Sequence, residues 1–302
     1  MKPRPTGALK EEGLMAPAQV ESNITRLADD FRWPGGKRVA VIFNIAYEAW
    51  SDGEAPGIGP MGNVLKPGFF DTNAHSWASF GAVRGIKRLL DIADRQGIKA
   101  SVMLNGVLAE RYPESVADVM RRGHEVIAHS WGMDVIPAYF NEEDEIKNIQ
   151  RNQDALKKAT GAGSQGWISP RGTGSLATPR LLAEAGFVHH GDCNDDDRPY
   201  VSSFGERRIV GIPLTMDVND LPFCIRYGRS PGELLQTFDD IFKAYREHET
   251  VPLMLDVTAH THVFGRPSGA WVYEAIIERA KQHDDVWICT RMDMARHVLA
   301  SV

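Results

Sequence analysis

The sequence predicts an α/β fold in which strands alternate with helices and form one barrel-like sheet. Short apolar runs typical of buried strands recur along the chain, and segments with helical spacing of apolar residues separate most of them. About seven strands interleaved with helices, without an internal repeat or a linker, favour one parallel-stranded domain. A doubly wound open sheet is the alternative, but no glycine-rich phosphate loop follows the first strand.

Composition is consistent with a globular enzyme and excludes several other classes. The chain has 302 residues, of which 43% are hydrophobic and 25% charged. Its net charge of -6 argues against general affinity for nucleic acid or an anionic membrane. The three cysteines are widely spaced, so we expect neither a disulfide framework nor a thiolate metal site. Because we find no signal peptide and no long apolar span, we expect a cytoplasmic protein.

The chain divides into an arm and one domain. Residues 1–37 are rich in proline, glycine and charge and predict an extended N-terminal arm. Residues 38–302 then form the single barrel domain. Within it, an irregular insertion at about 46–79 has Gly or Pro every few residues and no periodicity. Insertions of this length are usually functional or contact another subunit.

The first half of the domain begins with a strand at 38–43, which follows Gly35-Gly36. The next periodic segment predicts a helix over 82–96, with apolar residues on one face. The pattern then predicts a strand at 99–104, short helices at 107–111 and 114–122, a strand at 125–128, and a helix over about 141–160.

The second half continues the alternation. A short strand at 167–168 precedes a helix that Thr178-Pro179 opens and Gly186 ends. Further strands are expected at 187–188 and 209–212. The last elements are a helix at 231–247, a strand at 251–257, a helix at 270–282, a strand at 286–288 and a helix at 292–300.

Polar side chains follow five of the predicted strands. In parallel barrels the carboxyl ends of the strands meet at one mouth, where active sites form. The groups are Asn44, Tyr47 and Glu48; His129, Ser130 and Asp134; Arg171 after residues 167–168; the acidic turn 192–200; and His260 with His262.

Histidine is the residue type that moves protons or ligates metals near neutral pH. His129 directly follows strand 125–128. His260 and His262 are one residue apart, a spacing that places both side chains on the same face of a strand. Either both serve a site, or one is functional and the other structural. The candidates for substrate contact are Tyr47, Ser130, Trp131, Asp196 and His262.

Five segments carry a resemblance to a known family. They are residues 43–48 (FNIAYE), 123–125 (GHE) running into His129-Ser130, 169–171 (SPR), 195–200 (DDDRPY), and His260 followed by 265–267 (GRP). Their order and spacing resemble the polysaccharide deacetylase superfamily of carbohydrate esterases. They are most similar to its intracellular branch, which includes cofactor-independent allantoinase and cytoplasmic peptidoglycan-deacetylase-like proteins. The resemblance implies an irregular, often seven-stranded (β/α) barrel over residues 38–298.

The chain departs from the family's metal motif. Zinc-binding members use an aspartate after the first strand and a His-Ser/Thr-x-x-His pattern, whereas this chain has no acid at 44–46 and has Met133 as the last residue of the pattern. A thioether is a poor zinc ligand. Asp134 could substitute, giving a Glu48, His129 and Asp134 site for zinc or another divalent metal. The allantoinase-like branch also lacks a complete metal triad, so a metal-free site is the alternative.

The resemblance implies a hydrolase in which water attacks a carbonyl bonded to nitrogen. Such chemistry needs water activation, oxyanion stabilisation and an acid for the departing nitrogen. Without a metal, Glu48 is the expected base and His129 positions the water or the carbonyl. His260 is the expected acid in either mechanism, and Arg171 would orient an acidic partner.

The expected substrate is a small cytoplasmic amide, cyclic imide or ureide, because secreted polysaccharide deacetylases carry a signal that we do not find here. An N-deacetylase of an amino sugar or peptidoglycan-type glycan is the second hypothesis. A third is a catalytically silent ligand-binding barrel, since two family metal ligands are absent. The resemblance also implies a homo-oligomer, either a dimer or a tetramer. The net charge of -6 gives no reason to expect a nucleic-acid or membrane partner.

Overall fold

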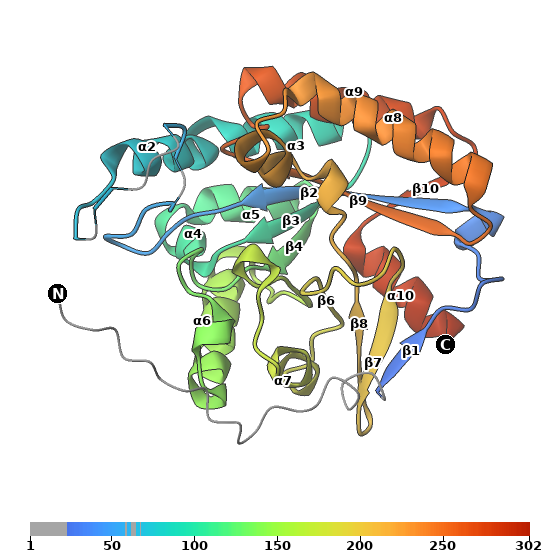
Figure 1. The fold of residues 1–302 in the computed structure, drawn as a ribbon. Coiled ribbons are helices and arrows are strands. Elements are labelled where there is room, and N and C mark those ends of the chain that lie inside the picture. The colour runs from blue at the N-terminus through green and yellow to red at the C-terminus, as the bar shows by residue number, and fades with distance from the viewer. Residues whose placement is uncertain (1–22, 58, 62–64, 67) are drawn as a thin grey trace.

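The structure, a computed structural model, describes residues 23–57, 59–61, 65–66 and 68–302. It confirms the predicted α/β barrel class: one large sheet curls into a half-barrel with helices on its outside (Figure 1). Within the described residues, eight neighbouring strands run parallel, as the alternation of strands and helices predicts. They are β2 (Val39–Tyr47), β3 (Ser101–Leu104), β4 (Glu125–Ala128), β5 (Gly166–Trp167), β6 (His189–His190), β8 (Arg207–Gly211), β9 (Leu253–His260) and β10 (Val286–Cys289).

Strand β2 is the centre of this sheet. β9 pairs with it from Val39 to Ala46. On its other side, β10 (Val286–Cys289) pairs with the first half of β2 and β3 with the second half. Because β2 is flanked along its whole length, all nine of its residues are buried, and its sequence is apolar except for Asn44 and the hydroxyl of Tyr47.

Two antiparallel strands extend the sheet beyond β8. β7 (Tyr200–Phe204) pairs with β8, and β1 (Ile24–Arg26) pairs with β7. β1 belongs to the segment predicted as an extended arm, and Leu27 and Trp33 after it are buried. The end of that segment therefore packs on the domain, while residues 1–22 lie outside the described part of the chain.

The helices follow the predicted order closely. α6 begins after Asn141, whose side chain accepts from the Asp144 amide, and it ends at Gly161 with φ 84°. The predicted 82–96 helix instead continues from α2 through a π-helical turn, Gly81–Gly85, so the irregular insertion ends earlier than residue 79. The described helices are α2 (Thr72–Phe80), α3 (Ile86–Arg95), α4 (Gly106–Arg111), α5 (Pro113–Arg121), α6 (Glu142–Thr160), α7 (Thr178–Glu184), α8 (Pro231–His248), α9 (Pro267–Lys281) and α10 (Arg291–Ser301).

Alternate residues of β2 face opposite sides of the sheet. Phe43, Ile45 and Tyr47 pack outward in the core that includes the helices. Ala46 faces inward, where it packs with an apolar layer formed by Met103, Ile127 and Ile168. This alternation aims the next inward position, Glu48, into the barrel at its carboxyl-terminal mouth.

Below the apolar layer lies an internal ion pair, formed by Arg291 and Asp256. Both side chains are completely buried and in direct contact. The guanidinium also donates to the Ile212 carbonyl at 3.0 Å and to Asn44 Oδ1 at 3.3 Å. Asp256 in turn accepts from Thr258 Oγ1 at 3.1 Å and from the Asn44 amide. These contacts join α10 to β2 and β9 from inside the barrel.

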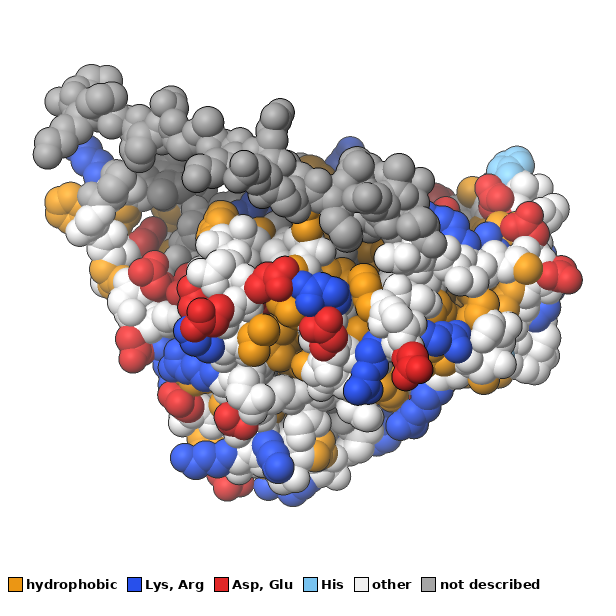
Figure 2. All heavy atoms as spheres, turned by 90° about the horizontal axis from the view of Figure 1, so that it is seen from below, with side chains coloured by type: hydrophobic (Ala, Val, Ile, Leu, Met, Phe, Trp, Pro, Cys, Tyr) orange, Lys and Arg blue, Asp and Glu red, His pale blue; other side chains and the backbone are white. Residues whose placement is uncertain are grey.

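The surface carries mixed charge. On the face shown in Figure 2, basic and acidic side chains alternate with small apolar areas instead of forming a patch of one sign. In the part of the chain that the structure describes, no helix is both long and apolar enough to span a membrane.

Candidate active site

Four side chains meet at the mouth, and we call Glu48, His129, His260 and His262 the site cluster. Glu48 lies at its centre. Its Oε1 is 3.6 Å from His129 Nε2 and 3.3 Å from His260 Nε2, and its Oε2 is 3.9 Å from His262 Nε2. Two of the four residues directly follow β2 and β4, and the other two lie at the end of β9 and just beyond it, so the parallel sheet brings together positions far apart in sequence.

The surroundings of Glu48 keep it ionised. Its side chain is only 4% exposed. Burial alone would raise its pKa, but the positive charge of His260, whose Nε2 faces the carboxylate, outweighs burial and holds the pKa well below its usual range. The barrel mouth therefore contains a buried carboxylate surrounded by imidazoles.

His260 is held between two carboxylates. Its Nδ1 is 2.6 Å from Asp220 Oδ1, and the other Asp220 oxygen accepts from the His260 and Phe264 amides at 2.8 and 3.0 Å. Burial would lower the pKa of His260, but the charges of Glu48 and Asp220 outweigh it and raise the pKa to about 10. His260 is therefore an imidazolium at neutral pH, with Nε2–H directed at Glu48.

Asp220 was missed by the sequence reasoning. It is fully buried and precedes a π-helical segment, Leu221–Arg226. Residues 213–230 show neither the alternation of a strand nor the spacing of an amphipathic helix, so the sequence does not predict that Asp220 is buried. The adjacent polar pair Asn219-Asp220 in a partly apolar stretch was the only local hint.

His129 is fixed by the strand-end backbone. Its Nδ1 lies 2.5 Å from the Ile168 carbonyl oxygen, and because a carbonyl only accepts, Nδ1 must donate. Its main-chain amide bonds to the Leu104 carbonyl, and its own carbonyl accepts from Asn105. These bonds leave Nε2 directed at Glu48.

His262 differs from the other two imidazoles. Its side chain is 1% exposed, yet neither ring nitrogen has a hydrogen-bond partner among the described residues. Trp77 and Trp50 contact the ring edge-to-face, with centroids 4.6 and 6.0 Å away. Burial lowers the pKa of His262 to about 4, so this ring is neutral at neutral pH.

Two glycines fix the turn between His260 and His262. The carbonyl oxygen of Thr261 lies so close to Gly85 and Gly265 that a Cβ at either position would come within 1.8 or 1.9 Å of it. Any larger residue there would displace the backbone. The π-helical turn after α2 thus packs directly on the histidine-bearing turn.

Tyr47 and Ser130 do not face the site cluster. Tyr47 points outward, where its hydroxyl contacts Ser115 Oγ at 3.2 Å and burial raises its pKa to about 12. Ser130 is fully buried, and its hydroxyl donates to the Val135 carbonyl at 2.6 Å and accepts from Asn148 at 2.9 Å. With φ 58° it is the bend that ends the His129 strand, a structural role instead of the predicted substrate contact.

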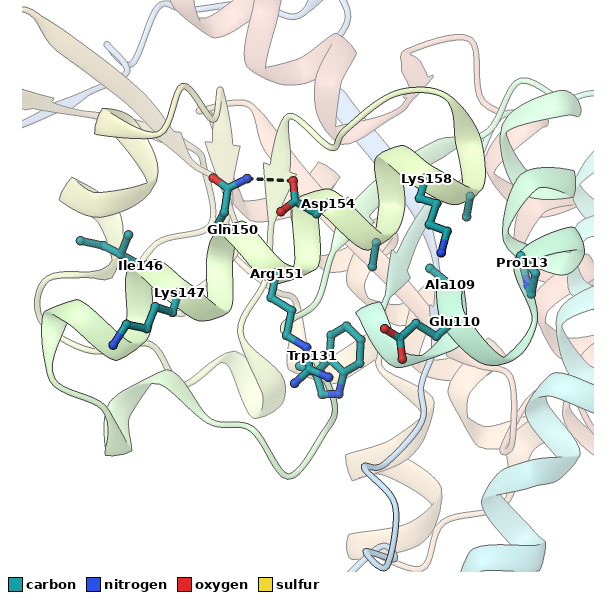
Figure 3. A pocket seen from close by; sticks show the side chains of 12 residues that line it. Ala109, Glu110, Pro113, Trp131, Ile146, Lys147, Gln150, Arg151, Asp154 and Lys158 are labelled. Carbon is teal, nitrogen blue, oxygen red and sulfur yellow. Dashed lines mark hydrogen bonds between the residues drawn. The ribbon is translucent and has the colours of Figure 1, made fainter.

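Trp131 lines a different cavity, a groove of about 880 Å³ between α4, α5 and α6 (Figure 3). The Arg151 guanidinium lies 3.3 Å above its indole ring. No member of the site cluster lines this groove. The prediction that Trp131 contacts substrate at the mouth therefore has no geometric support.

Asp196 and Arg171 also lie apart from the cluster. Asp196 forms an ion pair with Arg26 of β1, and Asp195 lies 3.7 Å from the same guanidinium. Arg171 is exposed, and its side chain makes no hydrogen bond or ion pair with any residue for which the structure gives a position. Its φ of 63° is unusual for a residue with a side chain, and like Ser130 it follows a barrel strand.

The predicted metal ligands are not assembled. Asp134 Oδ1 accepts from the Ser51 amide at 2.8 Å instead of joining Glu48 and His129. Over residues 23–57, 59–61, 65–66 and 68–302, no group of three or more His, Cys, Asp or Glu side chains is arranged to hold a metal ion. The side chains present therefore do not fit the zinc site of the family.

Similar proteins agree with this architecture. A family model described as polysaccharide deacetylase matches residues 70–190. A peptidoglycan deacetylase of Helicobacter pylori is 25% identical over 278 residues, which cover 81% of this chain and 92% of that protein. The crystal structure of Puue allantoinase superposes with a TM-score of 0.79 at 28% identity, covering 89% of this chain and 93% of that one.

A crystal structure from Pseudomonas aeruginosa PAO1, described as a probable polysaccharide deacetylase, is 30% identical with a TM-score of 0.78. The match covers 88% of this chain and 92% of that one. With the same barrel and this extent of shared sequence, the chain belongs to the polysaccharide deacetylase family, whose members are hydrolases of carbon–nitrogen bonds other than peptide bonds.

Proposed function

We propose that this hydrolase cleaves the C–N bond of a small amide, cyclic imide or ureide by direct attack of water on the carbonyl. One observation carries the proposal: the buried carboxylate of Glu48 lies 3.3 Å from the imidazole of His260, which Asp220 holds from behind. A base and an acid at this separation can act on opposite ends of the same reacting bond.

Glu48 and His129 position the water. Glu48 Oε1 and His129 Nε2 are 3.6 Å apart. The imidazole donates through Nδ1, so its Nε2 can accept, as the carboxylate oxygen does. A water that donates to both atoms turns its oxygen lone pair towards the carbonyl carbon of the substrate. Attack forms the new C–O bond while the water proton passes to Glu48.

His260 completes the reaction. As the tetrahedral intermediate collapses, the C–N bond breaks and Nε2–H of His260 protonates the departing nitrogen. Glu48 then holds the proton from water, and His260 is neutral. Transfer of that proton across the 3.3 Å between Oε1 and Nε2 restores the starting charges. Asp220 stabilises the protonated form at the start and end of each cycle.

The mechanism uses no metal step because Asp134 and Met133 do not supply the family's ligands at this mouth. We therefore propose that turnover depends on the side chains alone. Metal analysis of the purified protein, with activity measured before and after chelation, tests this point. Loss of activity on chelation, followed by recovery with one specific divalent ion, would overturn it.

Removal of the acetyl group from an amino sugar is the second candidate. The peptidoglycan deacetylase relative favours it, and the reaction would use the same acid and base. A catalytically silent ligand-binding barrel is the third. Its weakness is the buried Glu48–His260 pair, because packing alone gives no reason to bury these charges at the mouth. A cytoplasmic location and a dimeric or tetrameric state remain part of the proposal.

The deciding experiment compares hydrolysis of hydantoin, allantoin, succinimide and chitin oligomers by the wild-type protein and by Glu48→Gln. Hydrolysis of a cyclic imide or ureide that Glu48→Gln abolishes supports the proposal. Acetate release from chitin oligomers alone establishes the second candidate. Ligand binding without any hydrolysis establishes the silent barrel.

A further inference from the structure

We propose that His262 recognises the substrate through an uncharged polar group next to the scissile carbonyl, as in a cyclic imide or ureide. The inference rests on the proposed function and narrows it to one substrate class. In such compounds an N–H or a second C=O lies one or two bonds from the carbonyl that water attacks. The imidazole of His262, which has no partner within the described part of the chain, is placed to bind that group.

The first argument is hydrogen-bond accounting. Both nitrogens of His262 are buried and have no partner among the described residues. Buried polar atoms are rarely left unpaired in native proteins, so unpaired nitrogens beside a buried carboxylate at the barrel mouth point to a partner from outside the protein, either a ligand or water. His129 and His260 differ because Nδ1 of each already has a fixed protein partner, at Ile168 and Asp220 respectively.

The second argument is position. His262 Nε2 lies 3.9 Å from Glu48 Oε2, on the opposite carboxylate oxygen from the one that faces His129 and His260. A carbonyl undergoing attack near Oε1 therefore places its neighbouring atoms near His262. In an N-acetyl amide the one N–H is on the departing nitrogen, which His260 protonates, and the other substituent of the carbonyl is a methyl group. A cyclic imide or ureide carries a second C=O or a further N–H in the ring, and that group can pair with His262.

The third argument is shape. Trp77 and Trp50 contact the His262 ring at interplanar angles of 85° and 78°. Their half-buried indoles limit the space beside the ring, which suits a flat ligand. A neutral imidazole offers one N–H and one lone pair, so it can satisfy either a carbonyl oxygen or an N–H.

The experiment measures binding separately from turnover. Hydantoin, dihydrouracil and chitotriose are titrated calorimetrically into Glu48→Gln protein, with and without His262→Phe or His262→Gln. Thermal midpoints of the ligand-free single variants are recorded alongside. Phe removes both ring nitrogens while keeping a flat apolar ring, whereas Gln keeps one donor and one acceptor.

We expect His262→Phe to weaken binding of hydantoin or dihydrouracil about tenfold, the usual effect of one lost neutral hydrogen bond. His262→Gln should recover part of that affinity. The ligand-free Phe variant should melt at the same temperature as wild type or higher, because an unpaired buried polar group has been removed. Chitotriose binding should not depend on residue 262.

Three results would overturn the inference. The first is unchanged hydantoin affinity in His262→Phe, and a lowered thermal midpoint beside it would make the imidazole structural. The second is no binding of either cyclic compound, and the third is hydrolysis that does not depend on residue 262. Failure of the proposed function is distinguishable: cyclic compounds would then bind in a His262-dependent way without being hydrolysed by the wild-type protein. Hydrolysis that needs Glu48 but does not depend on residue 262 would support the proposed function and overturn only the inference about His262.

Discussion

Two buried charge clusters lie in the same barrel and differ in how completely they are paired. The internal ion pair of Arg291 and Asp256 is fully buried, and Asn44, Thr258 and a carbonyl oxygen satisfy its remaining polar atoms. In the site cluster one layer above, both nitrogens of His262 lack a partner among the residues that the structure places.

The difference shows how to separate structural from reactive charge. A cluster whose polar atoms are all paired within the protein has no group left to bind a ligand. Removing one of its charges lowers the free energy of unfolding. An incompletely paired cluster at a mouth is stable only because the surrounding structure positions it, and a ligand can supply the missing partners. Mutations in the site cluster should therefore lower activity and leave stability nearly unchanged, whereas mutations in the internal ion pair should lower stability and leave activity nearly unchanged.

The largest expected effect is on catalysis at the mouth. Glu48→Gln removes the base but keeps the shape of the side chain, and it should lower kcat by about 10²–10⁴-fold. The fold should be retained because Asp220 still pairs with His260. Steady-state kinetics on a confirmed substrate, with thermal unfolding as the control, measure both effects. Unchanged turnover would show that the site cluster is not the active site.

The second effect is on stability at the internal ion pair. Asp256→Asn leaves the buried charge of Arg291 without its counter-ion and should cost about 3–5 kcal/mol of unfolding free energy. Activity per folded molecule should change little. Urea unfolding gives the free energy, and the double variant Asp256→Leu with Arg291→Met is the matched control, because it removes both charges. If the double variant is no more stable than Asp256→Asn, the unpaired charge is not the cause.

The third effect concerns the pH dependence of stability. Folding raises the pKa of His260 to about 10, above the value of about 6.5 in an unfolded chain. Its stabilising contribution is therefore complete below about pH 6.5 and is lost as the pH rises through 10. Between pH 7 and 10, the free energy of unfolding measured in urea should fall more steeply with pH for wild type than for His260→Gln. Parallel curves would contradict the assigned imidazolium.

The smallest effect is expected on chelation, which should leave catalytic activity nearly unchanged. Because Asp134 bonds to the Ser51 amide and not to the site cluster, incubation with EDTA should leave kcat/KM within about twofold of the untreated protein. A His129→Ala variant is the companion measurement. Its activity should fall without any change in bound metal, whereas loss of a metal ion together with activity would identify His129 as a ligand.

The sequence predicted the parts of this molecule that depend on periodicity. Alternation along β2 and β9 brings Glu48 and His260 to one mouth, and strand 125–128 delivers His129 there. The same rule explains one mismatch: Tyr47 precedes Glu48 and must face the opposite side of the sheet. Its position near the end of the strand suggested a place in the site. Its side chain instead points to the outer face of the sheet, because successive residues of a strand face opposite sides.

Features that depend on long-range pairing left no local pattern. Asp220 reaches His260 from a segment without periodicity, and Arg26 meets Asp196 across 170 residues of chain. Ser130 and Trp131 follow His129 directly, but the left-handed bend at Ser130 turns the chain away from the mouth. Such backbone reversals depend on neighbours such as Asn148, which no spacing rule identifies.

The close packing of Gly85 and Gly265 against Thr261 has a consequence for attempts to alter this protein in the laboratory. A randomised library that includes either glycine will consist mostly of misfolded members, because every other amino acid brings a Cβ onto the Thr261 oxygen. Trp50 and Trp77 are half-buried and contact His262 from loop and helix positions without that restriction. Diversity for a new substrate range is therefore best introduced at the two indoles, with the glycine-clamped turn left as it is.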